Sequence, residues 1–131
     1  MNKTTILAFS VLLGLATTAE AAFPEGQWTG KFWDAKTGKL IATDGNCIVS
    51  DGTWYNTKAP GMQGKWFMKG DEIYIHAYSA LENKDVYSSQ LQKLSPTLMG
   101  GRHQHWTTDG SLAIFATTTL SYSSSTCLPP A

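Results

Sequence analysis

The sequence has no clusters of like charge, a single arginine and hardly any helical periodicity. Ten of its 131 residues are Lys or Arg and ten are Asp or Glu, and they are spread singly along the chain. Nucleic acids and anionic membrane surfaces are bound by clustered positive charge, so the sequence argues against both as partners. The lack of helical spacing among the apolar residues after the first twenty argues against a helical fold.

Motifs of the common catalytic classes are also missing. No serine stands in a G-x-S-x-G context, and no glycine-rich phosphate loop precedes a helical segment. The aspartates nearly all fall in turns, where this side chain bends or caps the backbone: Asp34, Asp44, Asp51, Asp71, Asp85 and Asp109. No carboxylate pair stands out as general acid and base. We therefore expect a non-catalytic protein without a cofactor, and a histidine-based acid–base site is the enzyme alternative.

One apolar run stands out, at the start of the chain. Lys3 precedes the segment "ILAFSVLLGLA" at residues 6–16, and Ala19-Glu20-Ala21 then fits the A-x-A cleavage pattern. The run is shorter than the roughly 20 residues of a membrane-spanning helix. No cysteine follows it directly, which argues against a lipid anchor. We interpret residues 1–21 as a cleaved signal peptide and expect a periplasmic or secreted protein.

The chain has only two cysteines, Cys47 and Cys127. In an oxidising compartment a disulfide between them is the expected state, and only one pairing exists. Redox or metal chemistry by two free thiols would favour a closer spacing such as C-x-x-C. The sequence therefore predicts a structural disulfide.

The rest of the chain consists of short segments rich in Trp, Tyr, Phe, Ile and Thr, separated by turn residues such as Gly, Asp, Asn and Pro. These segments predict eight antiparallel strands in simple succession, at residues 27–33, 39–49, 53–57, 64–69, 72–79, 85–94, 97–106 and 111–122. We find no internal repeat and no linker, so residues 22–131 are expected to form one domain.

The segment "GKWFMKGDEIYIHA" shows how the strands divide into two faces. A two-residue turn at Gly70-Asp71 pairs Met68 with Ile73 and Trp66 with Ile75, which gives one continuous apolar face. The other face is mostly polar. A sheet of about eight strands with one apolar face and no helices must curl or fold on itself. Short connections throughout favour an up-and-down β-barrel over a Greek-key sandwich.

The segment "EGQWTGKFW" carries a family resemblance. A Gly-x-Trp that opens the first strand of an eight-stranded exported barrel resembles the calycin group, which includes lipocalins and avidins. The resemblance implies a barrel whose first-strand tryptophan, here Trp28, packs across the floor, and an interior that holds a small ligand.

The segment "GGRHQHW" brings two of the three histidines together. His103 and His105 lie on one face of a strand, a spacing that can chelate a metal, with His76 as the candidate third ligand. No carboxylate flanks the pair, and the two cysteines are expected to bond to each other. We therefore predict no metal site and keep the three histidines as an alternative.

The turn at "TTDG" decides which of these side chains face the interior. A two-residue turn pairs His105 with Ile114 and turns both histidines inward. A three-residue loop with a bulge pairs Trp106 with Leu112 and turns Arg102 and Trp106 inward. The second arrangement buries the larger aromatic, and we favour it by a narrow margin. Arg102 would then contact a ligand, or stack on a tryptophan or pair with a carboxylate.

The aromatic content is high, with five Trp, five Tyr and five Phe. The interior of a small barrel cannot hold all of them. Trp54 and Tyr55, in "DGTWYNTKAPG", are either core residues of a short strand or exposed contacts, since exposed Trp and Tyr are enriched at binding surfaces.

Two hypotheses follow. The first is an exported, non-catalytic binding protein that holds a small or partly apolar ligand at the barrel mouth. Its candidate contacts are Trp28, Trp54, Tyr55, Arg102 and Trp106. The second is a module that binds a protein partner, as an inhibitor or immunity protein does, through exposed aromatic residues.

Overall fold

The computed structural model describes residues 22–79, 86–106 and 111–131. The predicted signal peptide, residues 1–21, lies outside the described residues, as does the whole turn at 107–110. Every regular element in the described ranges is a β-strand. No helix capable of crossing a membrane is found in these ranges.

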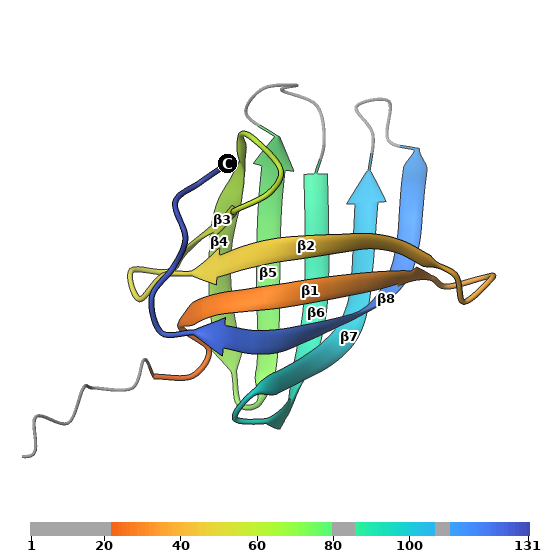
Figure 1. The fold of residues 1–131 in the computed structure, drawn as a ribbon. Helices are drawn as coiled ribbons and strands as arrows, with labels where there is room; N and C mark the ends of the chain where they lie inside the picture. Colours follow the sequence, from red (N-terminus) through yellow and green to blue (C-terminus); the bar gives the residue numbers. More distant parts are fainter. Residues whose placement is uncertain (1–21, 80–85, 107–110) are drawn as a thin grey trace, which may run out of the picture.

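Eight antiparallel strands form a closed barrel in which each strand pairs with the next, and the last pairs with the first (Figure 1). The strands are β1 (Gly26–Asp34), β2 (Leu40–Ile48), β3 (Thr53–Asn56), β4 (Met62–Lys69), β5 (Glu72–Ser79), β6 (Val86–Ser95), β7 (Leu98–Trp106) and β8 (Leu112–Ser124). This confirms the predicted up-and-down barrel.

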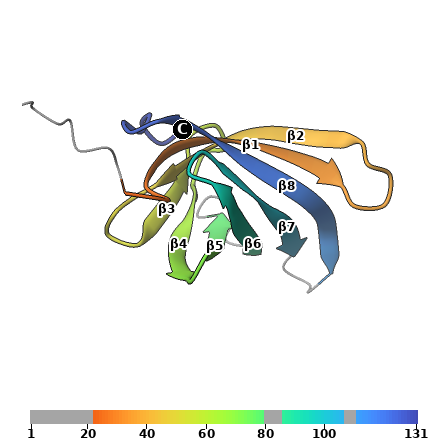
Figure 2. The same cartoon turned by 90° about the horizontal axis from the view of Figure 1, so that it is seen from below.

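The barrel is flattened into two layers whose strands cross. In Figures 1 and 2, β1, β2 and the end of β8 lie across β4 to β7. The long strand β8 connects the layers, because its residues 112–121 pair with β7 and its residues 116–124 pair with β1. A sharply coiled sheet of this kind has two different ends and one enclosed interior.

All eight predicted strands are present, and no predicted boundary differs from the observed one by more than two residues. The predicted hairpin is confirmed as well. Met68 pairs with Ile73 and Trp66 with Ile75, around a turn in which Gly70 has a φ of 60°. This left-handed conformation is the one that glycine adopts without steric cost.

One end of the barrel is closed by aromatic side chains. Trp28 is 1% exposed, and its Nε1 donates a hydrogen bond of 2.8 Å to the carbonyl oxygen of Pro24. Phe23 and Tyr122 pack edge-on against the Trp28 ring at centroid distances of 5.7 and 5.3 Å. Trp66 donates from its Nε1 to the carbonyl oxygen of Val49. Trp28 therefore lies in a floor of aromatic side chains at this end of the barrel.

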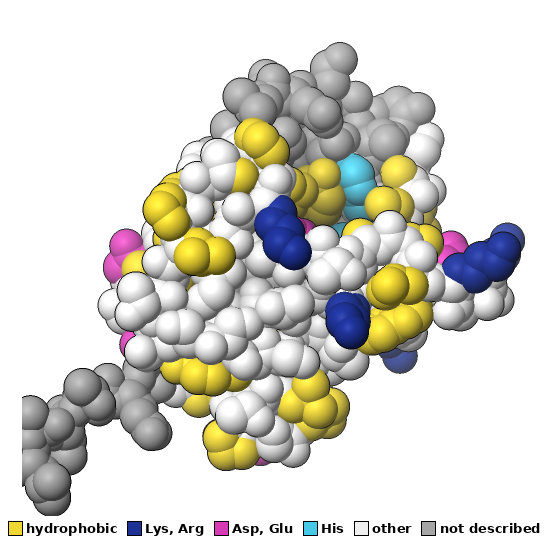
Figure 3. Space-filling model, viewed as in Figure 1, with side chains coloured by type: hydrophobic (Ala, Val, Ile, Leu, Met, Phe, Trp, Pro, Cys, Tyr) yellow, Lys and Arg dark blue, Asp and Glu magenta, His cyan; other side chains and the backbone are white. Residues whose placement is uncertain are grey.

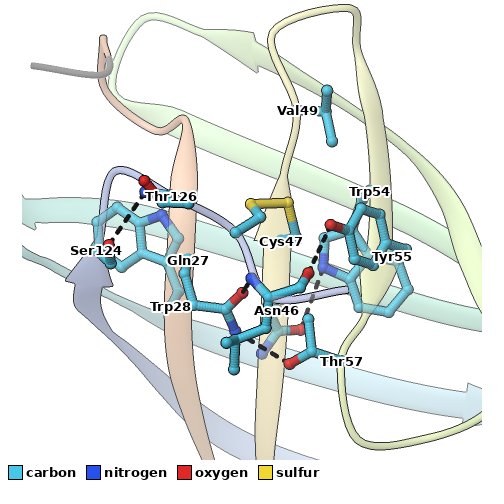
Figure 4. The surroundings of a disulfide bond; sticks show 12 residues. Gln27, Trp28, Asn46, Cys47, Val49, Trp54, Tyr55, Thr57, Ser124 and Thr126 are labelled. Carbon is cyan, nitrogen blue, oxygen red and sulfur yellow. Dashed lines mark hydrogen bonds between the residues drawn. A yellow bond between two sulfur atoms is a disulfide. The ribbon is translucent and has the colours of Figure 1, made fainter. Parts of the chain in front are cut away.

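The disulfide between Cys47 and Cys127 is present, which confirms that prediction (Figure 4). It joins β2 to the segment after β8, and β1 lies between β2 and β8 in the sheet. The tail is held further by hydrogen bonds from the Leu128 amide to Gln27 Oε1 (3.1 Å) and from the Tyr55 hydroxyl to the Leu128 carbonyl (2.7 Å). The tail is thus fastened across the outside of β1, β2 and β3.

Candidate functional site

A cavity of about 260 Å³ lies inside the barrel toward the end opposite the tryptophan floor. Ten apolar or aromatic side chains line it: Phe32, Ile41, Ala42, Trp54, Met62, Ile75, Ala77, Tyr87, Ile114 and Leu120. Five polar side chains complete the lining: Asp44, Asn46, Ser89, His103 and His105. An apolar cavity with a few polar groups has the usual composition of a small-molecule site.

The cavity is reached from one face of the molecule. Figure 3 shows a hollow there, in which histidine side chains are visible between apolar ones. Several strand ends near this hollow carry exposed apolar side chains, among them Ile41, Val86 and Leu112. The rim of the cavity is therefore apolar as well.

The register of β7 against β8 turns both paired histidines into the barrel. His103 pairs with Ala116 and His105 with Ile114. The narrow preference for Arg102 and Trp106 as the inward pair was wrong. Trp106 does pair with Leu112, as that alternative required, but the register shifts between His105 and Trp106. Ala113 is skipped in this register, so a bulge in β8 supplies the Trp106 pairing and leaves the histidines inside the barrel.

His103 is held in the cavity wall as a neutral imidazole. Its Nδ1 lies 2.9 Å from the Ser89 hydroxyl oxygen, and its ring packs on Phe32 at 4.8 Å and on Tyr87 at 5.9 Å. Burial and, to a smaller extent, the nearby His105 lower the pKa of His103 to about 4. The side chain therefore carries no charge at neutral pH.

Asp44 is the acidic group of the cavity. One of its carboxylate oxygens accepts the backbone N–H of Gly45, and the other accepts the amide Nδ2 of Asn56. Burial raises the pKa of Asp44, against the opposing effect of these hydrogen bonds and of the charge of Lys58. The surroundings of Asp44 thus disfavour a negative charge in this part of the barrel.

Asn46 and Trp54 form a polar contact in the cavity wall (Figure 4). Trp54 Nε1 donates a hydrogen bond of 3.1 Å to Asn46 Oδ1. Because an indole N–H only donates, this contact identifies which end of the Asn46 amide is oxygen. The Nδ2 end of the same amide is buried without a hydrogen-bond partner.

The five predicted ligand contacts are not brought together. Trp54 lines the cavity, whereas Trp28 is in the floor and Tyr55 contacts the tail. Arg102 is exposed on the outer surface, where it pairs with Gln90. Trp106 is half-buried at the end of β7 and is not part of the cavity wall. The structure thus places one of these five side chains at the cavity.

The histidines divide between the two faces of the barrel. His76 is exposed, and its ring is nearly parallel to that of Phe67 at 6.5 Å. His103 and His105 line the cavity. The described part of the chain holds no group of three or more His, Cys, Asp or Glu side chains placed to bind a metal ion.

Sequence reasoning missed Asp44 and Asn46. Asp44 was expected in a turn, but it lies within β2 and faces the cavity. A signal was present, because Ala42, Asp44, Asn46 and Ile48 alternate along one strand and must share a face. Polar residues at inward positions of a barrel strand mark an interior site.

No family profile and no curated protein matches this sequence. Among solved structures, a redesigned β-barrel is similar to this chain, with a TM-score of 0.52 and 23% sequence identity. The match covers 76% of this chain and 91% of the redesigned barrel. At this level of identity the likeness shows the barrel fold alone, and the calycin relationship stays a prediction.

Proposed function

We propose that this chain is an exported, non-catalytic binding protein that holds a small, partly apolar ligand at the open end of its barrel. The observation that carries the proposal is the cavity of about 260 Å³ lined by ten apolar or aromatic side chains and five polar ones. Such a composition supplies contact area from the walls and orientation from a few polar groups.

Two features support export. Residues 1–21 have the sequence pattern of a cleaved signal peptide. Cys47 and Cys127 form a disulfide, a bond that persists in oxidising compartments and is rare in the reducing cytosol. Periplasmic or secreted localisation is therefore part of the proposal.

The non-catalytic assignment depends on the basicity of His103. The Ser89 hydroxyl and His103 Nδ1 are 2.9 Å apart, which is the contact expected between a nucleophile and its base. A general base works best with a pKa near the working pH, and the pKa of His103 is about 4. An imidazole of such low basicity is a poor acceptor for the serine proton, so we assign this pair to the cavity wall.

Native mass spectrometry of the chain exported by its own host tests the proposal. We expect the protein to retain a small molecule. Ala77→Leu places a larger side chain in the cavity and should abolish retention, whereas Ala113→Leu, on the exposed side of β8, should leave it unchanged. Circular dichroism would check that both variants fold. A wild-type protein that retains no small molecule would contradict the proposal.

A second candidate function is binding of a protein partner. The observation that favours it is the set of large apolar side chains exposed near the open end: Leu40, Ile41, Val86, Leu112 and Phe115. Exposed apolar groups gathered in one region are typical of interaction surfaces. In the same mass spectrum, a bound polypeptide in place of a small molecule would favour this candidate.

A further inference from the structure

Asn46 presents a hydrogen-bond donor with no partner. The residue is 4% exposed, and its Oδ1 is already occupied by Trp54 Nε1. Its Nδ2 is buried without a hydrogen bond. Leaving a buried donor unpaired costs about 1–3 kcal/mol, so natural proteins rarely keep one without a reason. Asn46 is one of the residues that line the cavity, and an acceptor atom on a bound ligand would satisfy this donor once the side chains that cover Nδ2 moved aside.

The neighbouring strand is built to leave room for this amide. Gly30 of β1 pairs with Asp44, one inward position along β2 from Asn46. A Cβ atom at Gly30 would lie 2.9 Å from Asn46 Nδ2 and 3.1 Å from Phe32 Cε2. Any larger residue would therefore push the amide or the Phe32 ring from its position. The donor and the aromatic wall beside it depend on the same glycine.

The charges around the cavity disfavour an anionic ligand. No Lys or Arg is among the described residues that line it, and its acidic group is Asp44. Burial already raises the pKa of Asp44. A ligand carboxylate would meet the same cost of burial without a cation to offset it.

The walls and the volume indicate a flat ligand of modest size. Phe32, Trp54 and Tyr87 contribute aromatic rings, which favour stacked or edge-on contact with another ring. A water molecule occupies about 30 Å³ in the liquid. The cavity of about 260 Å³ therefore has room for roughly nine waters, or for a bicyclic aromatic molecule.

We propose that the cavity selects uncharged, planar aromatic molecules that carry a hydrogen-bond acceptor, and that this acceptor receives the hydrogen bond from Asn46 Nδ2. The inference rests on the proposed binding function and specifies its ligand class. It predicts discrimination between molecules of the same shape that differ in a single acceptor atom.

Quinoline, naphthalene and 2-naphthoate provide the test. Quinoline and naphthalene have the same shape, but only quinoline has an acceptor nitrogen, and 2-naphthoate is an anion. Calorimetric titration should show quinoline binding roughly three- to tenfold more tightly than naphthalene, the ratio that one neutral hydrogen bond gives. The anion should bind most weakly. In an NMR titration, quinoline should shift the Asn46 side-chain amide resonances more than naphthalene does.

Two variants separate the donor from the rest of the wall. Asn46→Leu combined with Trp54→Phe removes both partners of the buried hydrogen bond, which avoids leaving the indole N–H unpaired. This double variant should bind quinoline and naphthalene equally. The matched control, Trp54→Phe alone, keeps the Asn46 donor and should keep the preference for quinoline.

A further variant covers the case in which the double variant does not fold. Gly30→Ala changes no polar group, but its methyl should displace the Asn46 amide and reduce the preference for quinoline. Equal affinity of the wild type for quinoline and naphthalene would overturn the inference and leave the proposed function standing. Binding of 2-naphthoate more tightly than quinoline would also overturn the inference and leave the proposed function standing. Failure of all three probes to bind would count against both proposals.

Discussion

At the scale of single residues, the cavity is defined by polar groups that the barrel keeps uncharged or only partly satisfied. His103 is neutral, Asp44 is held by two donors, and the amide nitrogen of Asn46 has no hydrogen-bond partner. Each group is surrounded by apolar side chains, which penalise charge and reward hydrogen bonding. The polar chemistry of the site therefore depends on burial as much as on residue type.

His103 should make the stability of the fold sensitive to acid. Its pKa is about 4 in the folded protein, below the ordinary 6.5. Between these values the unfolded chain binds a proton that the folded chain does not, so the free energy of unfolding falls as the pH falls through this window. The loss reaches roughly 3 kcal/mol once the pH is below both values. Asp44 acts in the opposite direction, because its raised pKa lets the folded state bind a proton first.

Urea denaturation at pH 7.5 and pH 4.5 checks this expectation. His103→Asn should lose less stability on acidification than the wild type does, and the contribution of Asp44 is common to both proteins. His76→Asn alters an exposed histidine on the outer face and should behave as the wild type. Equal acid sensitivity of His103→Asn and the wild type would show that the buried imidazole does not cause it.

The alternation of apolar and polar residues along single strands predicted which face many side chains occupy. It failed for other side chains for a physical reason. The alternation correctly placed Trp66, Met68, Ile73 and Ile75 on one face. It could not place the histidines, because a bulge between His105 and Trp106 allows either pairing locally. Which pairing forms is decided by the fit of the whole sheet, to which residues far apart in the sequence contribute.

At the scale of elements, β6 and β7 approach each other unusually closely at Gly101. A Cβ atom at this position would lie 2.0 Å from the backbone carbonyl oxygen of Gln90, the residue that precedes its pairing partner Leu91. At the adjacent Gly100, a Cβ atom would lie 3.1 Å from Cδ1 of Leu94, which is the end of a flexible side chain. The two neighbouring glycines thus have different roles, and only Gly101 lets two backbones approach each other closely.

Alanine substitutions should separate these roles. Gly101→Ala forces the backbones of β6 and β7 apart and should cost about 3 kcal/mol or more, or prevent folding. Gly100→Ala needs a shift of one leucine side chain and should stay within about 1 kcal/mol of the wild type. Urea denaturation measures both. Similar stability of the two variants would contradict the close approach at Gly101.

The strands themselves were predictable from the sequence because their signals are local. Turn residues bound each segment, and the pairing around Gly70 follows from the length of its turn. The close approach at Gly101 was not predictable, since it depends on how strongly the sheet coils after all eight strands have paired. The cavity is a product of the same coiling, so its volume also lay beyond sequence reasoning.

At the scale of the whole molecule, closure of the barrel is reinforced by a covalent bond. The disulfide joins residues 80 positions apart, from β2 to the tail that follows β8. The hydrogen bonds of Leu128 to Gln27 and Tyr55 attach the same tail to β1 and β3. The beginning and the end of the barrel sequence are therefore held together in three ways: by the backbone pairing of β1 with β8, by the hydrogen bonds of the tail, and by the disulfide.

Removing the bridge should weaken the fold without changing its topology. Cys47→Ala combined with Cys127→Ala frees a loop of this length, and chain entropy predicts a loss of roughly 4 kcal/mol. Guanidinium denaturation measures the loss, and limited proteolysis should cleave the tail after residue 124 sooner than in the wild type. A reducing agent should reproduce the effect in the wild type and have no effect on the double variant. Unchanged stability of the double variant would contradict this role.

The order of the strands also has a consequence for how the chain is made. Cys127 follows the eighth strand, and that strand supplies the second partner of the first. During synthesis, neither the pairing of β1 with β8 nor the disulfide can form until nearly the whole domain has been synthesised. Until that moment Cys47 is a lone thiol on a growing sheet with two unpaired edges, which is the state most open to mispairing with another chain.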